Sequence, residues 1–288
     1  MINEPKLNCG DWPDDLASSK AVGQRAGKHP SIVMTDGASP AEGAGDDLAK
    51  RLLDVILATA GLVLFAPLLL PAMALVRWQD GGPSLYLAPR AGRGGRPFRM
   101  AKLRTMVIDA DRCGVASTAD DDPRVTPLGR LLRRYKIDEL PALWDVLRGE
   151  MSLVGPRPDN LSEINPADPV DRRLLALRPG LTDMASIVFA DEGAILRGQA
   201  DADRAYATLI RPWKKRLGLL YVERRSVVLD LRLIALTLVA LVVSRRRALD
   251  ALARLLARLD APAELRRVAL RREPLVQLAT MRTSSYDH

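Results

Sequence analysis

Two adjacent carboxylates, Asp138 and Glu139, stand directly before Leu140-Pro141 and an amphipathic stretch that ends near Arg148. An acidic residue just before a proline is typical of a helix start. Exposed backbone amides at such a terminus favour a phosphate group, and two neighbouring carboxylates can supply a nucleophile and a ligand for Mg²⁺. The pair therefore predicts a phosphoryl-transfer site. The alternative is an ordinary helix cap, in which the acids only complement the helix dipole.

Basic residues lie close to this pair in the sequence. A guanidinium group can hold a phosphate through two parallel hydrogen bonds, and a Pro-Arg-Pro segment restricts the backbone that aims Arg157. Each cation alone could be a solvated surface charge, but together they indicate a phosphorylated substrate. The cations are Lys102, Arg104, Arg130, Arg133, Arg134 and Arg157.

The composition excludes several other kinds of active site. The chain has 288 residues with two histidines and two cysteines, and none of them lies in a metal-binding or catalytic-triad pattern. Carboxylates, lysines and arginines must therefore carry any chemistry. A net charge of +8 and a pI near 9.8 suit a polyanionic partner. Because aromatic residues are few and form no basic stacking platform, nucleic acid is not the predicted partner.

The elements that must position this site begin with an uncharged apolar stretch, 55–76, between Asp54 and Arg77. As a helix rising about 1.5 Å per residue, it would just cross a hydrocarbon core about 30 Å thick. Pro67 and Pro71 each remove a backbone donor, so a bend is expected near its middle. Basic residues on both sides place both ends on the cytoplasmic face. The stretch is predicted either to enter the membrane and return or to cross it as an ordinary kinked helix.

The other predicted elements are short. Ranges 84–88 and 97–103 flank a Gly/Arg-rich turn and predict a β-hairpin. Apolar periodicity predicts helices over 128–135, 139–148, 170–177, 210–223 and 227–243. A stripe of leucines beyond residue 245 predicts a basic amphipathic helix, which either lies on an anionic membrane surface or packs its leucines on the domain. The stripe consists of Leu249, Leu252, Leu255, Leu256 and Leu259.

Longer motifs resemble the bacterial sugar transferases, which are monotopic polyprenyl-phosphate phosphoglycosyl transferases, in their compact form. The most specific motif is IDELPALWDVLRGEMSLVGPRP at 137–158. Shorter ones lie at 50–54, at 97–106, at 178–182 and from Tyr221 to Leu231, so the resemblance covers about residues 48–245. The segment from Thr182 to Glu192 resembles one branch of the family, and the choice of sugar is expected to reside there.

For the fold, the resemblance implies an α+β, mainly helical catalytic domain on the cytoplasmic face of the bacterial inner membrane. It implies a re-entrant membrane helix broken at Pro67, a small β-hairpin and amphipathic interfacial helices. The expected divisions are a disordered tail at 1–46, the re-entrant helix at 47–77, the catalytic domain with its interfacial helices at 78–243, and a basic amphipathic extension at 244–288.

For the chemistry, the resemblance implies transfer of a sugar-1-phosphate from a nucleoside diphosphate sugar, with uridine expected, to polyprenyl (undecaprenyl) phosphate. Asp138 matches the family nucleophile, which forms a phosphosugar-aspartyl intermediate, and Glu139 matches its partner acid. Both are expected to hold Mg²⁺. The matching phosphate and substrate contacts are Lys102, Arg104, Arg133, Arg157 and Arg178.

The expected product starts bacterial polysaccharide or glycoconjugate synthesis, with membrane lipids and downstream glycosyltransferases as further partners. The alternative function is a non-catalytic membrane scaffold or regulator of the same fold, against which the intact Asp138-Glu139 pair argues. A basic DNA-binding protein is disfavoured by the apolar stretch 55–76.

Overall fold

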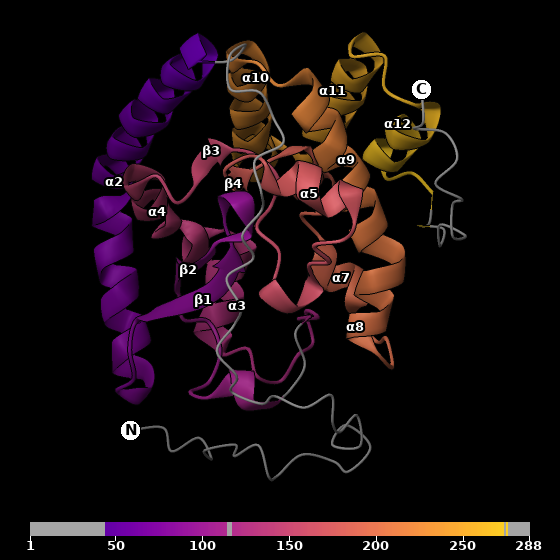
Figure 1. Cartoon of the computed structure of the whole chain (residues 1–288). Helices are drawn as coiled ribbons and strands as arrows, with labels where there is room; N and C mark the ends of the chain where they lie inside the picture. The colour runs from indigo at the N-terminus through magenta and orange to yellow at the C-terminus, as the bar shows by residue number, and fades with distance from the viewer. Residues whose placement is uncertain (1–43, 114–116, 274, 276–288) are drawn as a thin grey trace.

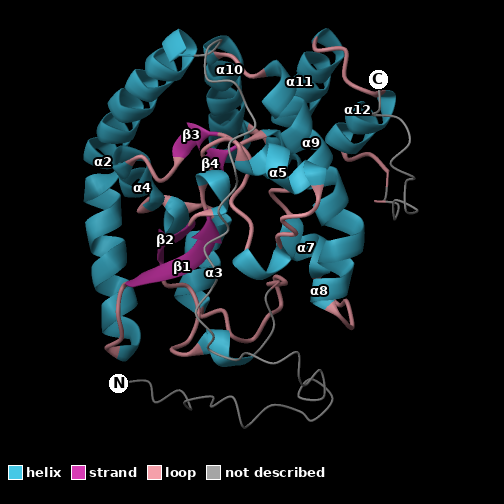
Figure 2. Ribbon diagram, in the orientation of Figure 1, coloured by secondary structure: helices cyan, strands magenta, loops and turns pink. Residues whose placement is uncertain are grey.

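The computed structural model describes residues 44–113, 117–273 and 275, and these are mainly helical (Figure 2). The predicted disordered tail lies almost wholly outside the described residues, as do both histidines. Two small sheets interrupt the helices, each of two strands. The chain is therefore α+β and mainly helical, in agreement with the prediction.

The longest element is α2 (Ala44–Asp80), which runs along one side of the domain (Figure 1). Within the described part of the chain, it is the one helix long and apolar enough to cross a membrane. Pro67 and Pro71 both lie inside it without ending it, and its two ends lie at opposite ends of the domain. The helix is thus continuous at Pro67, where a break was predicted, and its return to the same side of a membrane stays a prediction.

Packing on both sides of the prolines explains the unbroken helix. In its first half Ala58 is fully buried, and a Cβ on Gly61 would lie 3.1 Å from a methyl carbon of Leu143. In its second half Ala72 and Val76 join a small buried cluster with Leu103 and Leu132. Both halves are thus held against the same domain, which offsets the backbone hydrogen bonds that the prolines remove.

The opposite face of α2 is apolar and exposed, which is unusual for a surface that faces water. Its exposed residues are Leu48, Leu52, Ile56, Val63, Leu64, Leu68, Leu70, Leu75 and Trp78.

The predicted hairpin is confirmed. Strand β1 (Leu85–Ala91) pairs antiparallel with β2 (Pro97–Leu103) across the 3₁₀ turn η1 (Arg93–Gly95). The chain then passes through η2 (Ala110–Cys113), α3 (Pro127–Arg134), η3 (Ile137–Glu139) and α4 (Ala142–Arg148).

A second, parallel pair of strands was not predicted. It joins β3 (Ser152–Val154) to β4 (Gly180–Thr182), with η4 (Leu161–Glu163) and α5 (Pro169–Leu175) in the connection. The backbone just after β3 lies very close to the start of β4. A Cβ on Gly180 would lie 2.1 Å from the nitrogen of Gly155. Glycine at these two positions lets the backbones come together and fixes the loop that follows β3.

The C-terminal half is a layer of helices that packs on the other side of this second sheet (Figure 1). The elements are α6 (Met184–Val188), α7 (Glu192–Leu196), α8 (Ala202–Ala205), the π-helical turn η5 (Tyr206–Ile210), α9 (Arg211–Arg224), α10 (Val227–Leu238), the π-helical turn η6 (Val239–Val243), α11 (Arg245–Arg258) and α12 (Ala263–Leu270).

The leucine stripe of α11 packs inside this half. Leu249, Leu252, Leu255 and Leu256 are buried in one core with α6, α9 and α10, and Leu259 packs against that core. The alternative that the stripe packs on the domain is therefore confirmed, and the expectation that it lies on a membrane surface is wrong. On α10 and η6, in contrast, Leu238, Val242 and Val243 are exposed.

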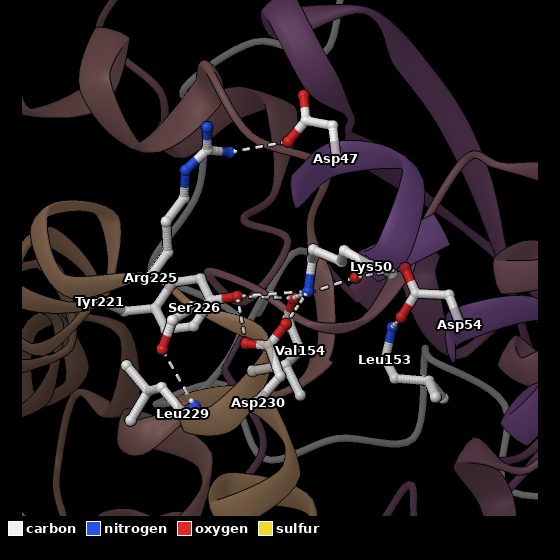
Figure 3. A network of polar contacts seen from close by, with 11 residues as sticks. Asp47, Lys50, Asp54, Leu153, Val154, Tyr221, Arg225, Ser226, Leu229 and Asp230 are labelled. Carbon is white, nitrogen blue, oxygen red and sulfur yellow. Dashed lines mark hydrogen bonds and ion pairs between the residues drawn. The ribbon is translucent and has the colours of Figure 1, made fainter. Parts of the chain in front are cut away.

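A buried polar network joins the start of α2 to the rest of the chain (Figure 3). Lys50 pairs with Asp230 and donates hydrogen bonds to the Val154 carbonyl at 2.9 Å and to the Tyr221 hydroxyl at 3.3 Å. Tyr221 donates to Asp230 at 2.7 Å. Burial raises the pKa of Asp230, and Lys50 and Tyr221 partly offset that rise. The Asp230 side chain is 2% exposed, so its carboxylate depends on these partners.

We expect Lys50→Met to destabilise the fold by about 3 kcal/mol, because it leaves a buried carboxylate unpaired. Lys50→Met combined with Asp230→Asn should recover much of that loss. The measurement is the free energy of unfolding in detergent. Arg173→Met serves as the control, because Arg173 pairs with Glu223 at the surface, and such pairs contribute about 1 kcal/mol or less. Equal losses for Lys50→Met and Arg173→Met would contradict the assigned role of Lys50.

Candidate active site

Asp138 lies in the tight turn η3 and is 7% exposed. Lys136, just before this turn, has a left-handed backbone with φ of 56°, which is uncommon for a residue other than glycine and is often found at functional sites. Within the described residues the Oδ1 atom of Asp138 is buried and has no hydrogen-bond partner. Neither η3 nor α4 has a side-chain cap. Asp138 is therefore not an ordinary helix cap.

The environment of Asp138 disfavours its charged form. Burial raises the pKa of the Asp138 carboxyl, and the neighbouring charge of Glu139 raises it further. The cations of Lys102, Lys136 and Arg133 act in the opposite direction but do not restore the ordinary value. An incompletely compensated buried carboxylate is the state expected of a nucleophile rather than of a structural ion pair.

Glu139 has the opposite environment. Arg157 Nη2 and Lys102 Nζ both donate to its Oε1 atom, the lysine at 3.3 Å. Burial by itself would raise the pKa of Glu139, but the charges of Arg157 and Lys102 outweigh it and hold the pKa well below its usual range. The two neighbouring carboxyls thus differ sharply: Glu139 is held as a compensated anion, and Asp138 is not.

Two strands bring these cations to Glu139. Lys102 projects from β2, which is fixed to α4 because the Ala101 amide donates to Asp145 Oδ2 at 2.7 Å. Arg157 follows β3, and its Nη1 donates to the Leu181 carbonyl of β4 at 2.8 Å. The predicted site residues Lys102 and Arg157 are therefore brought together with the acid pair.

Arg133 reaches the site from α3, and its Nε donates to the Thr105 hydroxyl at 2.8 Å. Helix α3 lies directly against the chain after β2, where a Cβ on Gly129 would be 1.9 Å from the Thr105 carbonyl oxygen. Glycine at 129 therefore permits the close approach. The charge of Asp138 acts on Arg133, so this predicted residue also belongs to the site.

Arg104 does not join the site in this structure. Its guanidinium binds both carboxylate oxygens of Asp80, at 2.6 and 2.5 Å. Its remaining donors go to the carbonyl oxygens of Pro83, Met106 and Val76. Since a guanidinium has five N–H groups, all of its donors are occupied. Arg104 fastens the end of α2 to the end of β2, and the prediction that it contacts phosphate is not supported.

Arg178 also lies apart from the acid pair. Its Nε donates to the Gly149 carbonyl at 3.0 Å, and its side chain lines a cavity that contains neither Asp138 nor Glu139. Arg178, which was predicted to contact the substrate, is therefore not brought together with Asp138 and Glu139.

A second polar cluster next to Arg157 was missed. The charges of Glu192 and Lys214 act on Arg157, Lys214 pairs with Glu192, and the Lys214 ammonium lies 4.9 Å from the centre of the Tyr206 ring. Tyr206 lies in the π-helical turn η5, a rare element often found at functional sites. In the sequence, only Glu192 of this cluster lay in a segment with a predicted role, the Thr182–Glu192 segment expected to choose the sugar. Lys214 and Tyr206 lie in later elements, where no pattern pointed to them.

Asp159 lies in the same region, two residues after Arg157. Burial and the charge of Glu163 raise the pKa of its carboxyl to about 6. Asp159 also acts electrostatically on Tyr206, which connects the loop after β3 to η5.

The residues present fit a divalent cation only as part of a larger set of ligands. Over 44–113 and 117–273, no group of three or more His, Cys, Asp or Glu side chains could enclose a metal ion. Mg²⁺ in phosphate-binding sites is commonly held by one or two carboxylates together with phosphate oxygens and water. The free Oδ1 of Asp138 beside Glu139 meets that lesser requirement.

This site combines two unlike carboxyls with a lysine and two arginines, as expected of a protein that acts on phosphate esters. A sequence profile of the bacterial sugar transferases matches residues 45–244. The chain belongs to this family.

Three relatives illustrate the similarity. A UDP-glucose:undecaprenyl-phosphate glucose-1-phosphate transferase of Caulobacter vibrioides is 46% identical over 49% of this chain and 54% of its own length. A UDP-N-acetylgalactosamine-undecaprenyl-phosphate N-acetylgalactosaminephosphotransferase of Aeromonas hydrophila is 37% identical over 48% of this chain and 34% of its own length. The exopolysaccharide production protein ExoY of Sinorhizobium fredii is 34% identical over 69% of this chain and 87% of its own length. The matches thus span about half and about a third of the first two relatives.

We expect Asp138→Asn to raise the unfolding temperature by a few degrees at neutral pH in metal-free buffer. Because the folded-state pKa of Asp138 is raised, this group favours folding only while protonated, and that contribution is lost as pH rises through the folded pKa. Asparagine removes the buried charge and nearly keeps the shape. The gain should shrink as the pH falls toward about 4, close to the unfolded pKa.

Thermal unfolding of both proteins across this pH range, with a chelator present, tests the expectation. Asp250→Asn is the control, since Asp250 pairs with Arg246 and Arg272 at the surface of α11 and its loss should bring no gain. A lower unfolding temperature for Asp138→Asn at neutral pH would show that the Asp138 charge is well compensated.

Proposed function

We propose that this protein transfers a sugar-1-phosphate from a UDP-sugar to undecaprenyl phosphate, as the first step of bacterial polysaccharide or glycoconjugate synthesis. The observation that carries the proposal is the buried, unpartnered Oδ1 of Asp138 beside a fully compensated Glu139. The activities after which the Caulobacter and Aeromonas relatives are named supply the donor and acceptor classes.

In the first step, Asp138 Oδ1 attacks the sugar-linked phosphorus of the donor. An oxygen–phosphorus bond forms to the carboxylate, the bond to the nucleoside monophosphate breaks, and the electron pair leaves with UMP. In the second step, a phosphate oxygen of undecaprenyl phosphate attacks the same phosphorus and releases Asp138 as a carboxylate. A covalent intermediate divides one transfer between two bulky anions into two easier displacements.

The cations around the pair balance the charge of this reaction. Arg157 and Lys102 both bind Glu139, the neighbour of Asp138, so in this mechanism they lie close to the phosphorus that Asp138 attacks. Arg133 approaches Asp138 from α3. Fixed cations in a site of low water content stabilise the charge that develops on phosphate oxygens during transfer. None of these steps requires a histidine.

Mg²⁺, when bound, supplies neutralisation of the diphosphate charge. Glu139 and Asp138 are the residues that would hold it, together with phosphate oxygens of the donor. Arg157 and Lys102 would fix the orientation of Glu139 toward the ion.

The same proposal places the site at a membrane surface. The exposed apolar face of α2 and the exposed apolar residues of α10 and η6 are suited to lipid, and the acceptor has a long hydrocarbon chain. We assign the protein to the inner membrane with its site on the cytoplasmic face, where nucleotide sugars are available. Downstream glycosyltransferases would then take up the lipid-linked product.

The test is nucleotide release by detergent-solubilised protein with undecaprenyl phosphate, Mg²⁺ and a panel of UDP-sugars. Wild type should release UMP, and Asp138→Asn should lose turnover by at least about a thousandfold, because the nucleophile is removed. Asp250→Asn serves as the matched control and should retain activity. Release of UDP would show transfer of the sugar without its phosphate and would refute the mechanism. Absence of turnover across the panel would favour the scaffold alternative.

A second prediction separates two arginines that look alike in the sequence. Arg157→Gln should lower kcat/KM by about a hundredfold, since it removes a cation next to the reacting phosphate. Arg104→Gln should instead lower the unfolding temperature, because it leaves Asp80 unpaired, while the folded protein keeps kcat/KM within about threefold. Steady-state kinetics and thermal unfolding of both variants provide the measurement. A large kinetic loss with unchanged stability for Arg104→Gln would return this residue to the substrate site.

A further inference from the structure

A second basic cavity lies at the beginning of α2, and it shares no lining residue with the Asp138 cluster. Its cationic lining comes from four parts of the chain: the start of α2, the turn η1, the segment just before β4 and the segment just before α10. The cations are Lys50, Arg51, Arg93, Arg178 and Arg225. Two carboxylates, Asp47 and Asp54, also line it, so cations outnumber acids.

The two carboxylates are already occupied by other partners. Asp54 accepts hydrogen bonds from the Ser152 hydroxyl at 2.8 Å and the Leu153 amide at 3.0 Å. Asp47 pairs with Arg225 at 3.3 Å. Lys50 is likewise held by Asp230 (Figure 3). Three cations, those of Arg51, Arg93 and Arg178, therefore face the cavity without a carboxylate partner in the described chain.

Backbone carbonyls aim these guanidinium groups. Arg178 Nε donates to the Gly149 carbonyl and Arg93 Nε to the Ala176 carbonyl, each through one N–H. The terminal amino groups of both side chains have no partner among the described residues. The two terminal nitrogens of Arg51 each donate one hydrogen bond to α4, Nη1 to the Val146 carbonyl at 2.6 Å and Nη2 to the Leu147 carbonyl at 2.8 Å. The outer edges of three positioned guanidinium groups suit a tetrahedral oxyanion such as a phosphate.

The surroundings indicate which phosphate would bind. The turns of α2 that carry Asp47, Arg51 and Asp54 also carry Leu48, Leu52 and Ile56, which are more than half exposed. A ligand held here would thus have its phosphate beside arginines and apolar helix surface next to it. An anionic phospholipid has this arrangement, whereas free phosphate would make no use of the apolar face.

We propose that the cavity lined by Arg51, Arg93 and Arg178 binds the phosphate group of an anionic membrane phospholipid, with its acyl chains along the exposed face of α2. This site is separate from the Asp138 chemistry and does not depend on the proposed function. Bound lipid would fix the height and orientation of the start of α2 on an anionic leaflet. The positive charge of the chain would then help to attach the protein to an anionic membrane as well as support the reaction.

Native mass spectrometry of the purified full chain in a neutral detergent tests the proposal. Phosphatidylglycerol and phosphatidylcholine are titrated separately onto wild type and onto Arg93→Gln/Arg178→Gln. Wild type should bind phosphatidylglycerol about tenfold or more tightly than the double variant, because two charge-assisted contacts are lost. Binding of phosphatidylcholine should be the same for both proteins.

Arg254→Gln/Arg258→Gln is the matched control, since these exposed arginines of α11 give the same change in charge away from the cavity. An equal loss of phosphatidylglycerol binding in this control would show a bulk charge effect and overturn the proposal, as would equal binding by all three proteins. Inorganic phosphate is the second probe. Displacement of phosphatidylglycerol by phosphate at similar concentration would overturn the lipid assignment in favour of a soluble anion.

Thermal unfolding without added lipid checks that the variants fold. If Arg178→Gln destabilises the chain through the lost Gly149 contact, Arg93→Gln alone carries the test. Arg93 is an exposed residue of η1, and within the described residues its side chain makes one hydrogen bond, to the Ala176 carbonyl. Its replacement should therefore leave the fold intact. A single variant that binds phosphatidylglycerol as tightly as wild type would then refute the site.

Discussion

Two neighbouring carboxylates in a buried turn repel each other, and the arrangement of the catalytic region follows from this constraint. In this structure the nearby cations compensate one of the two carboxylates much more than the other. Lys102 and Arg157 both bind the same oxygen of Glu139, which leaves Asp138 with a raised pKa and a free oxygen. The unequal division of cations turns two similar side chains into one fixed anion and one incompletely compensated carboxyl, the group that the proposed mechanism uses as nucleophile.

The two sheets position the two cations that bind Glu139. Strand β2 carries Lys102 and is fixed to α4 by Asp145, which binds an amide of the strand. The parallel pair of β3 and β4 carries Arg157 and fixes it through the Leu181 carbonyl. The strands supply buried core residues, such as Met100 and Leu103 of β2 and Val154 of β3, and each sheet also places one cation. This explains why a mainly helical domain retains two separate two-stranded sheets.

The sequence predicted those parts of the site that lie within one continuous motif. Asp138, Glu139 and Arg157 fall within 22 consecutive residues, and local patterns also predicted the hairpin and the main helices. Arg104 and Arg178 could not be distinguished from Lys102, because what separates them is a partner distant in the chain: Asp80 for one and the Gly149 carbonyl for the other. The continuity of α2 through Pro67 could not be predicted for a related reason. A proline weakens a helix locally, but tertiary packing on both sides of it decides whether the helix ends.

The end of β2 connects the candidate site to the apolar helix α2. Lys102 and Arg104 are two residues apart, one binding Glu139 in the candidate site and the other binding Asp80 at the end of α2. At the other end of α2, Lys50 joins the helix to β3 and α10, next to the loop that carries Arg157. The apolar helix is therefore fastened at both ends close to the strands that place Lys102 and Arg157 on Glu139. A helix attached in this way is linked mechanically to Lys102 and Arg157, so a shift of α2 would be transmitted to the surroundings of Asp138. In the proposed reaction the acceptor phosphate is confined to the membrane surface, and that connection would then set the height at which Asp138 and the acceptor meet.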